Sequence, residues 1–218
     1  MDEVRQLIYR GAEANIYLTQ WHGYNVIKKE RVAKKYRVGL LDEELRRRRT
    51  VHEAQLLYDA KRNGVPAPTV LLLSPKDSTL LLSRIDGERL REKLARVDKG
   101  EAVGLCLEVG RLVARLHRAG IQHGDLTTSN MVQTADGRIF LVDFGLGAYS
   151  TQVEDMGVDI LLMKRALTST HYRISEECFQ SFLKGYRLEL GEEKADTVFE
   201  RVKAIERRGR YVERRVSK

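Results

Sequence analysis

Three polar residues in the middle of the chain have the types and the spacing that phosphoryl transfer requires. Asp125 and Asn130 lie in the segment H-G-D-L-T-T-S-N, and Asp143 begins the segment D-F-G. In phosphoryl transfer a protein supplies a carboxylate that orients and deprotonates the nucleophile, and oxygen ligands that hold magnesium on the phosphates. We therefore predict Asp125 as the catalytic carboxylate and Asn130 and Asp143 as the magnesium ligands, with Asn130 also part of the catalytic loop.

Each of these pieces has an ordinary explanation when it is taken alone. Asp125 could be a turn residue after Gly124, Asn130 could be a loop cap, and D-F-G is a common tripeptide. Their joint occurrence, after a long helical pattern and around a short hairpin, favours chemistry over coincidence. The order D-x4-N, hairpin, D-F-G is that of the protein-kinase signature set. For His123 we expect packing and hydrogen bonding within the loop instead of chemistry.

The elements that must position these residues follow from the periodicity of the sequence. Alternating apolar and polar residues predict strands at residues 6–10, 15–21, 24–28, 70–73 and 79–84. A helix is predicted over residues 42–62, which contain neither Gly nor Pro, with Asp42 as its N-cap. Beyond residue 86 the pattern is mostly helical. The predicted helices span residues 88–97, 101–119, about 153–167, 175–188 and 192–208, and a short hairpin has strands at 131–132 and 139–142.

This order of elements predicts an α+β fold of the two-lobed protein-kinase type. Residues 1–86 are predicted to form a small N-lobe with an antiparallel sheet and one main helix. Residues 87–206 are predicted to form a reduced, mostly helical C-lobe, and residues 207–218 a basic C-terminal tail.

The predicted nucleotide site draws on the N-lobe. Lys28 ends a predicted strand as V-I-K, where a kinase has the V-A-I-K lysine that grips the α- and β-phosphates. Glu53 lies on the next helix and is expected to pair with Lys28, although a surface pair with Arg49 is the alternative. A kinase phosphate loop reads G-x-G-x-x-G, and only its first glycine remains here. The predicted ATP-binding residues also include Gly11, Ala12, Glu13 and Ala14 of this loop and Ser83, Arg84 and Ile85 between the lobes.

Several parts of an ordinary kinase are missing. Gly124 stands in place of the arginine of H-R-D, and Thr127 stands where serine/threonine kinases often carry a lysine. No A-P-E segment follows Gly145, and the next predicted helix begins at about residue 153. The chain therefore lacks a full activation segment, so phosphorylation of that loop is not an expected switch.

Taken together, these segments resemble the small atypical kinase of the KEOPS complex, a family also called PRPK or Bud-thirty-two. The resemblance runs nearly the whole length of the chain. One departure is Met156-Gly157, which stands where the family usually has lysine-alanine. The segments that carry the resemblance are R-G-A-E-A at 10–14, I-K-K at 27–29, Y-R at 36–37, L-R-R-R-R-T-V-H-E-A at 45–54, I-Q-H-G-D-L-T-T-S-N at 121–130, L-V-D-F-G-L-G at 141–147 and V-E-D-M-G-V-D at 153–159.

The resemblance implies a function and partners. Members of the family bind ATP with Mg²⁺ or Mn²⁺, phosphorylate serine or threonine, often on themselves, and can hydrolyse ATP. They partner the Kae-type enzyme that makes threonylcarbamoyladenosine in tRNA, and they contact a small Cgi-type subunit through the N-lobe. As in larger kinases, Asp159 on the helix after D-F-G is predicted to anchor the catalytic loop. The alternative for Asp159 is an ordinary aspartate in the first turn of a helix, favoured by the helix dipole.

Composition describes a soluble globular protein, with 42% hydrophobic and 32% charged residues. No apolar run approaches the roughly 18 residues of a membrane span, and no signal segment is recognisable, so we expect a cytoplasmic protein. The two cysteines match no metal or redox spacing. The dense charge, with few Asn and Gln residues, suggests an archaeal source.

The net charge of +8 is concentrated in part at the C-terminus. We predict that Gly209 breaks the last helix and leaves a mobile end that serves tRNA or a partner. A solvated tail without a partner is the alternative. The basic residues of the predicted tail are Arg207, Arg208, Arg210, Arg214, Arg215 and Lys218.

Two other functions stay open at this point. A small-molecule kinase of the aminoglycoside or choline type also uses H-G-D and a trailing asparagine, but it needs a large helical insertion for which few residues remain after Gly145. A nucleotide-bound scaffold or tRNA-binding module without essential catalysis is the second alternative. Mg²⁺-dependent ATP turnover would distinguish an enzyme from such a module.

Overall fold

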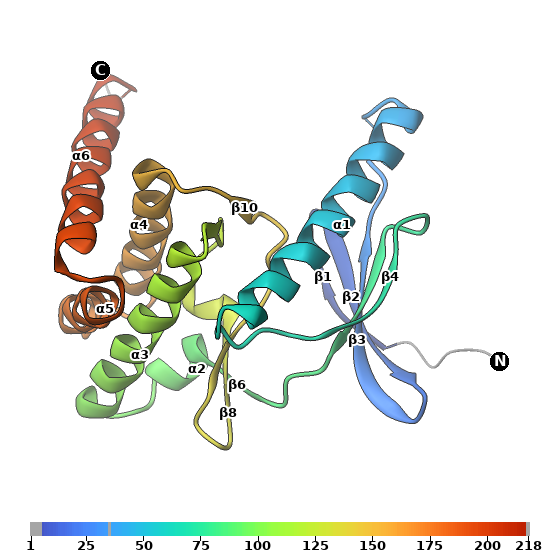
Figure 1. Cartoon of the computed structure of the whole chain (residues 1–218), viewed down its shortest axis with the longest axis horizontal. Coiled ribbons are helices and arrows are strands. Elements are labelled where there is room, and N and C mark those ends of the chain that lie inside the picture. Colours follow the sequence, from blue (N-terminus) through green and yellow to red (C-terminus); the bar gives the residue numbers. More distant parts are fainter. Residues whose placement is uncertain (1–5, 35, 217–218) are drawn as a thin grey trace.

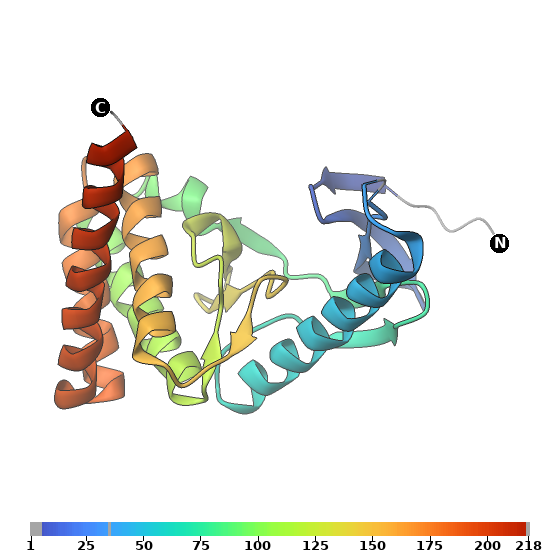
Figure 2. The same ribbon diagram turned by 90° about the horizontal axis from the view of Figure 1, so that it is seen from above.

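The computed structural model of the chain describes residues 6–34 and 36–216, and for residues 209–216 it describes the backbone alone. Figures 1 and 2 show a sheet with one long helix at one end of the molecule and a group of helices at the other end. Residues 84–86 connect the two ends, which share a hydrophobic core. None of the helices in the described part of the chain is long and apolar enough to cross a membrane.

The N-terminal lobe is a five-stranded antiparallel sheet with the order β1-β2-β3-β5-β4, accompanied by helix α1. The elements are β1 (Gln6–Arg10), β2 (Ala14–Trp21), β3 (Tyr24–Arg31), α1 (Gly39–Arg62), β4 (Val70–Ser74) and β5 (Thr79–Ser83). All of them were predicted, with small differences at their ends. The extension of β3 to Arg31 matters most, because it brings Lys29 and Arg31 into the regular strand.

Helix α1 begins at Gly39, three residues before the predicted N-cap. Asp42 does not cap it, because it lies within the first turn, where its N–H donates to Val38 O at 2.9 Å; its carboxylate accepts a hydrogen bond from Nε of Arg46 at 2.7 Å. Unbroken helix formers then carry the helix to Arg62, and it passes along the sheet towards the other lobe (Figure 2).

The C-terminal lobe combines a small three-stranded sheet, of order β6-β8-β9, with helices. Its elements are β6 (Gly87–Arg89), α2 (Leu90–Leu94), α3 (Lys99–Arg118), β7 (Ile121–Gln122), the 3-10 turn η1 (Thr128–Asn130), β8 (Met131–Thr134), β9 (Ile139–Leu141), β10 (Ala148–Tyr149), α4 (Val153–Thr170), α5 (Ser175–Leu190) and α6 (Glu192–Val216). Helices α3 and α5 pack so closely that a Cβ on Gly110 would lie 2.0 Å from the carbonyl oxygen of Phe182.

Two predictions about this lobe are wrong. Residues 88–97 do not form one helix. Glu88 lies in strand β6, where it pairs with Gln133 of β8, and the short helix α2 begins only at Leu90. Gly209 does not break the last helix, which continues to Val216. A glycine costs a helix only about 1 kcal/mol relative to alanine, and here strong helix formers flank it.

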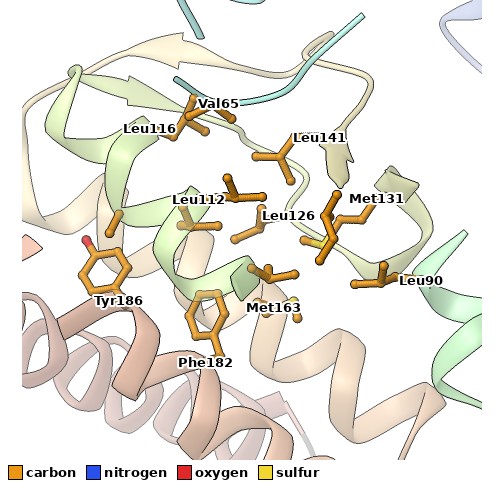
Figure 3. Packing of buried hydrophobic residues seen from close by; sticks show 14 of the residues in the cluster. Val65, Leu90, Leu112, Leu116, Leu126, Met131, Leu141, Met163, Phe182 and Tyr186 are labelled. Atoms are coloured by element: carbon orange, nitrogen blue, oxygen red, sulfur yellow. The ribbon is translucent and has the colours of Figure 1, made fainter. Parts of the chain in front are cut away.

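The hydrophobic core contains residues of α1 and β5 in the N-terminal lobe and extends between the helices of the C-terminal lobe (Figure 3). Leu112 and Leu116 of α3 pack there with Leu141 of β9. Leu126 and Met131 are also fully buried, and they lie on either side of the segment that carries Asn130. The predicted catalytic loop is therefore fixed to the core by apolar residues within and next to it.

Candidate active site

The predicted catalytic loop connects β7 to β8 and brings Asp125 and Asn130 into contact. The amide Nδ2 of Asn130 donates to the carboxylate Oδ2 of Asp125 at 2.8 Å and to its backbone oxygen at 2.9 Å. A turn closed by the hydrogen bond from Asn130 N to Thr127 O sets this approach. Since the nitrogen of the amide is held by Asp125, the oxygen Oδ1 of Asn130 is the atom left to face a cation.

His123 connects this loop to the strand before D-F-G. Its Nε2 lies 3.2 Å from the carbonyl oxygen of Val142, and its Nδ1 lies 3.3 Å from the backbone N–H of Asp125. A carbonyl only accepts and an N–H only donates, so the ring carries its proton on Nε2 and is neutral. Burial lowers the pKa of His123 despite the nearby aspartates. The ring packs against Phe144, with 4.7 Å between ring centroids. These contacts are structural ones, of the kind expected for this residue.

Asp159 of α4 lies fully buried beneath the start of the loop. Its Oδ2 accepts the backbone N–H of His123 at 2.6 Å, and its Oδ1 accepts that of Gly124 at 2.9 Å. The Nε2 of His117 lies 3.2 Å from the same carboxylate, and the Nδ1 of His117 lies 2.9 Å from the hydroxyl of Tyr186. Asp159 thus contacts the loop that it was predicted to anchor, and the structure extends this network to α3 and α5.

The lysine that meets Glu53 is Lys29 and not Lys28. The Nζ of Lys29 lies 2.5 Å from Oε1 of Glu53 and 2.7 Å from Oδ1 of Asp143. Lys28 lies near Glu30, with 4.0 Å between Nζ and Oε2. Successive side chains of a strand point to opposite faces, so only one of two adjacent lysines can face α1. The predicted Lys28–Glu53 pair is therefore wrong by one residue.

The opposite charges of Lys29 and its carboxylate neighbours favour the ionised forms of Lys29 and Asp143. Burial alone would lower the pKa of Lys29, but the Glu53 and Asp143 carboxylates outweigh burial and raise it. Partial burial would raise the pKa of Asp143, but the Lys29 ammonium outweighs that effect and lowers it. Each of the two charges thus favours the ionised form of the other.

Arg31 is a member of the cluster that the sequence reasoning missed. Its Nη2 donates to Oε2 of Glu53 at 2.7 Å, and its side chain is almost fully buried. It follows Lys29 by two residues in β3, so both side chains lie on the same face of the sheet. This spacing is the signal that could have identified it, once Lys29 had been chosen.

The D-F-G segment lies directly on the catalytic loop. Asp143 has a φ of 64°, which is uncommon for a residue with a side chain and typical of functional sites. A Cβ on Gly124, whose φ is 78°, would lie only 2.1 Å from the carbonyl oxygen of Leu146. The glycine that replaces the arginine of H-R-D is thus required by the close approach of the segment after D-F-G.

The predicted phosphate loop is a tight turn between β1 and β2, closed by the hydrogen bond from Gly11 N to Ala14 O at 2.9 Å. Glu13 points to α1, where its carboxylate accepts a bond from Nη1 of Arg49 at 2.8 Å. The alternative pair between Arg49 and Glu53 does not form, because Arg49 binds Glu13 and Glu53 binds cations of β3. Ala12 is exposed, and its carbonyl accepts a bond from Lys34. The negative charge of Glu13 is thus compensated by an arginine of the same lobe.

The connection between the lobes holds the last predicted ATP-binding residues. Ser83 ends β5, and its hydroxyl accepts the backbone N–H of Thr69 at 2.8 Å. Arg84 pairs with Asp86 at 2.7 Å, and Ile85 lies between them, half-buried. The hydroxyl of Ser83 thus ties the end of β5 to the chain just before β4.

Asn130 and Asp143 offer oxygen atoms to a divalent cation. In the described part of the chain no group of three or more His, Cys, Asp or Glu side chains could hold a metal ion. Mg²⁺ in phosphoryl-transfer enzymes is bound by one or two carboxylates together with the phosphates of the substrate. The oxygen donors present therefore fit a magnesium ion that arrives with a nucleotide.

The basic residues near the C-terminus lie on α6, which is attached to α4. Lys164 pairs with Glu206 at 2.7 Å, and Glu154 pairs with both Arg201 and Arg208. Arg207 is exposed. The side chains of Arg210, Arg214 and Arg215, and all of Lys218, lie outside the described residues.

Comparison with known proteins identifies relatives over nearly the whole chain. A family model described as the lipopolysaccharide kinase (Kdo/WaaP) family matches residues 5–186. The KEOPS complex subunit Bud32 of Pyrococcus abyssi is 44% identical over 96% of this chain and 97% of that protein. A probable serine/threonine-protein kinase, the BUD32 homolog of Archaeoglobus fulgidus, is 41% identical over 95% of this chain and 97% of its own length.

A longer protein and a solved structure are also similar to this chain. A probable bifunctional tRNA threonylcarbamoyladenosine biosynthesis protein of Methanothermobacter thermautotrophicus is 40% identical over 95% of this chain, which covers 37% of that protein. The crystal structure of the Rio2 kinase from Chaetomium thermophilum superimposes with a TM-score of 0.59 at 15% identity, over 91% of this chain and 71% of that one. This likeness confirms the predicted two-lobed, kinase-like α+β fold. The chain belongs to the kinase family that the Kdo/WaaP model describes and, within the relatives found, to the family of the KEOPS complex subunit Bud32.

Proposed function

We propose that the chain is an ATP- and Mg²⁺-dependent atypical serine/threonine protein kinase, with ATPase activity, that acts in the KEOPS complex. The observation that carries this proposal is the position of Lys29, whose ammonium bridges Glu53 of α1 and Asp143 of D-F-G. A lysine held between these two carboxylates is the arrangement that aligns the phosphates of ATP in protein kinases. The names of the Bud32 relatives supply the serine/threonine specificity and the KEOPS complex.

Each residue of the site has a role in this proposal. Lys29 binds the α- and β-phosphates, and Glu53 holds Lys29 in place. Asp125 orients the acceptor hydroxyl and takes its proton. Asn130 and Asp143 would hold Mg²⁺, which neutralises charge on the phosphates when it is bound.

The loops around this cluster complete the proposed nucleotide site. The turn from Gly11 to Ala14 covers the phosphates, and the segment 83–85 meets the base through its backbone. We place the boundary between the lobes after residue 86, where the chain leaves β5 and enters β6. Under this division residues 87–206 form the C-lobe.

Partners and location follow from the relatives by inference. We propose that the chain works in the cytoplasm with a Kae-type threonylcarbamoyl-transferase subunit and with a Cgi-type small subunit. A relative in which a chain like this one forms part of a bifunctional tRNA threonylcarbamoyladenosine biosynthesis protein supports this proposal. We further propose that the basic end of α6 contacts tRNA through the assembled complex.

Truncation tests the proposed role of the C-terminal segment. A chain that ends at Arg208 keeps the pair between Arg208 and Glu154, so the attachment of α6 to α4 is retained. We expect this truncated protein to fold and turn over ATP normally, but the complex that contains it should bind tRNA more weakly and with a flatter salt dependence. Unchanged tRNA affinity and unchanged modification activity would contradict the role.

Turnover of ATP with and without Mg²⁺ tests the central proposal. Asp143→Ala should abolish Mg²⁺-dependent turnover, because it removes the only carboxylate among the proposed metal ligands. The matched control is Asp136→Ala in the exposed β8–β9 turn, which should leave turnover unchanged. If the wild type and Asp143→Ala are equally inactive, the chain is a nucleotide-bound scaffold. Transfer of labelled γ-phosphate to protein, compared with release as phosphate, separates the kinase activity from the ATPase activity.

A further inference from the structure

Glu53 is held by two cations from one strand and not by one. Its side chain is 1% exposed and lies between Lys29, at 2.5 Å from Oε1, and Arg31, at 2.7 Å from Oε2. Each carboxylate oxygen therefore has its own positively charged donor. Two charge-assisted hydrogen bonds to different oxygens fix both the position and the rotation of a carboxylate.

The two donors are not equivalent. The ammonium of Lys29 is shared, because it also lies 2.7 Å from Asp143, whose side chain is half-exposed at the open side of the cluster. The guanidinium of Arg31 is 4% exposed, and it contacts no carboxylate of the site other than Glu53 among the described ion pairs. Arg31 therefore binds Glu53, whereas Lys29 bridges Glu53 and Asp143.

Arg31 also lies beside the D-F-G segment. A Cβ on Gly145 would come within 3.4 Å of Nη2 of Arg31 and within 3.2 Å of Nζ of Lys29. One guanidinium from β3 thus touches α1 through Glu53 and approaches the glycine of D-F-G. Arg31 of the sheet therefore lies beside both helix α1 and the D-F-G segment.

We propose that Arg31 is a positioning residue for ATP turnover. It fixes Glu53, and through Glu53 it fixes the ammonium of Lys29, so that α1 is held in its working position without a phosphorylated activation segment. The inference rests on the proposed kinase and ATPase function. It gives Arg31 no contact with the nucleotide and assigns its guanidinium to Glu53 alone.

The test compares Arg31→Met with Arg31→Lys in ATP turnover at saturating Mg²⁺. Arg31→Met should lower kcat by about tenfold to a hundredfold, the usual effect of a misplacement of about 1 Å at a reacting group, with a smaller change in KM for ATP. Arg31→Lys keeps the positive charge but replaces the planar guanidinium with an ammonium, so it should recover part of kcat. A loss that appears in KM alone would indicate contact with ATP and would overturn the inference.

A double-mutant cycle with Glu53→Gln separates positioning from general stability. If Arg31 acts through Glu53, Arg31→Met should lower kcat little further in the Glu53→Gln protein. Effects that multiply would overturn the inference. If Arg31→Met fails to fold, the same cycle with Arg31→Lys gives the same decision.

The matched control is Arg46→Met on α1. Arg46 also donates to a buried carboxylate, that of Asp42, at 2.7 Å, but it lies outside the cluster. The Arg46→Met variant should lose about as much stability in denaturant unfolding as Arg31→Met does, and its kcat should stay within about twofold of the wild type. A wild-type protein with no Mg²⁺-dependent turnover would overturn the proposed function. Wild-type turnover that survives Arg31→Met would overturn this inference alone.

Discussion

Gly124→Ala adds a single carbon atom where the predicted catalytic loop meets the segment after D-F-G. The new Cβ would lie 2.1 Å from the oxygen and 2.6 Å from the carbon of the Leu146 carbonyl. Real Cβ atoms essentially never come closer than 3.0 Å to another heavy atom, so the two segments must separate by at least about 0.9 Å. Backbone cannot turn aside as a side chain can, so the separation must displace the D-F-G segment, the catalytic loop or both.

Two separable effects follow from this change. The φ of Gly124 is 78°, and a residue with a Cβ pays about 1–2 kcal/mol in this left-handed region. Displacement of Asp143, three residues before Leu146, by about 1 Å should lower ATP turnover by about a hundredfold. The strain lowers stability, whereas the displacement lowers activity.

The control for the strain alone is Gly137→Ala, in the turn between β8 and β9. Gly137 has a φ of 84°, but a Cβ there would meet nothing within 4 Å. In denaturant unfolding both variants should lose stability, and in a steady-state ATPase assay only Gly124→Ala should lose activity. If Gly124→Ala turns over ATP as well as Gly137→Ala does, the close approach of the two segments is not needed for catalysis and our reasoning fails.

Three further changes test the assignments of single residues. Lys29→Met should lower ATP turnover by at least about a hundredfold, because it removes the phosphate donor, whereas Lys28→Met on the opposite face should change it by no more than about twofold; equal losses would contradict the assignment. Asp125→Asn should lower phosphoryl transfer by about 10²- to 10⁴-fold while ATP binding persists in a titration, and a collapse of affinity would make Asp125 a structural residue. Burial lowers the pKa of His123 below 6.5, so the unfolded chain binds more protons and stability falls as the pH drops below about 6.5. His123→Gln should flatten this part of the pH profile of denaturant unfolding, and an unchanged slope would contradict the role of burial.

The residues of the catalytic loop were predictable because their geometry is local. Asp125 and Asn130 are five positions apart in one turn, and Asp143 follows the next hairpin. Spacing along the chain then nearly determines spacing in space. The same holds for the strands and the long helices, whose periodicity and flanking residues are written in the sequence.

The choice between Lys28 and Lys29 could not be made in the same way. Lys28 and Lys29 both follow Val26-Ile27, so either of them could be the lysine of the V-A-I-K motif. The face of each lysine depends on how β3 pairs with its neighbours, where Lys28 lies opposite Tyr17 of β2 and Leu81 of β5. A slip of one residue reverses every side chain of a strand, and only the packed sheet determines which face meets α1. Arg31 escaped prediction for the same reason, since its partner Glu53 is distant in sequence.

The segment after D-F-G explains how a kinase fold can dispense with a long activation segment. Residues 148–149 form β10, which pairs with β7 at the start of the catalytic loop. From there the hydroxyl of Tyr149 donates to Asp59 of α1 at 2.5 Å, and its ring lies edge-on to that of His52, with 5.5 Å between centroids. Burial raises the pKa of Tyr149, so the hydroxyl stays a donor. In many kinases, phosphorylation must order a longer loop before that loop can position the helix of the N-lobe. In this chain β10 pairs with β7 through backbone hydrogen bonds, and Tyr149 connects the loop to α1 without a phosphate.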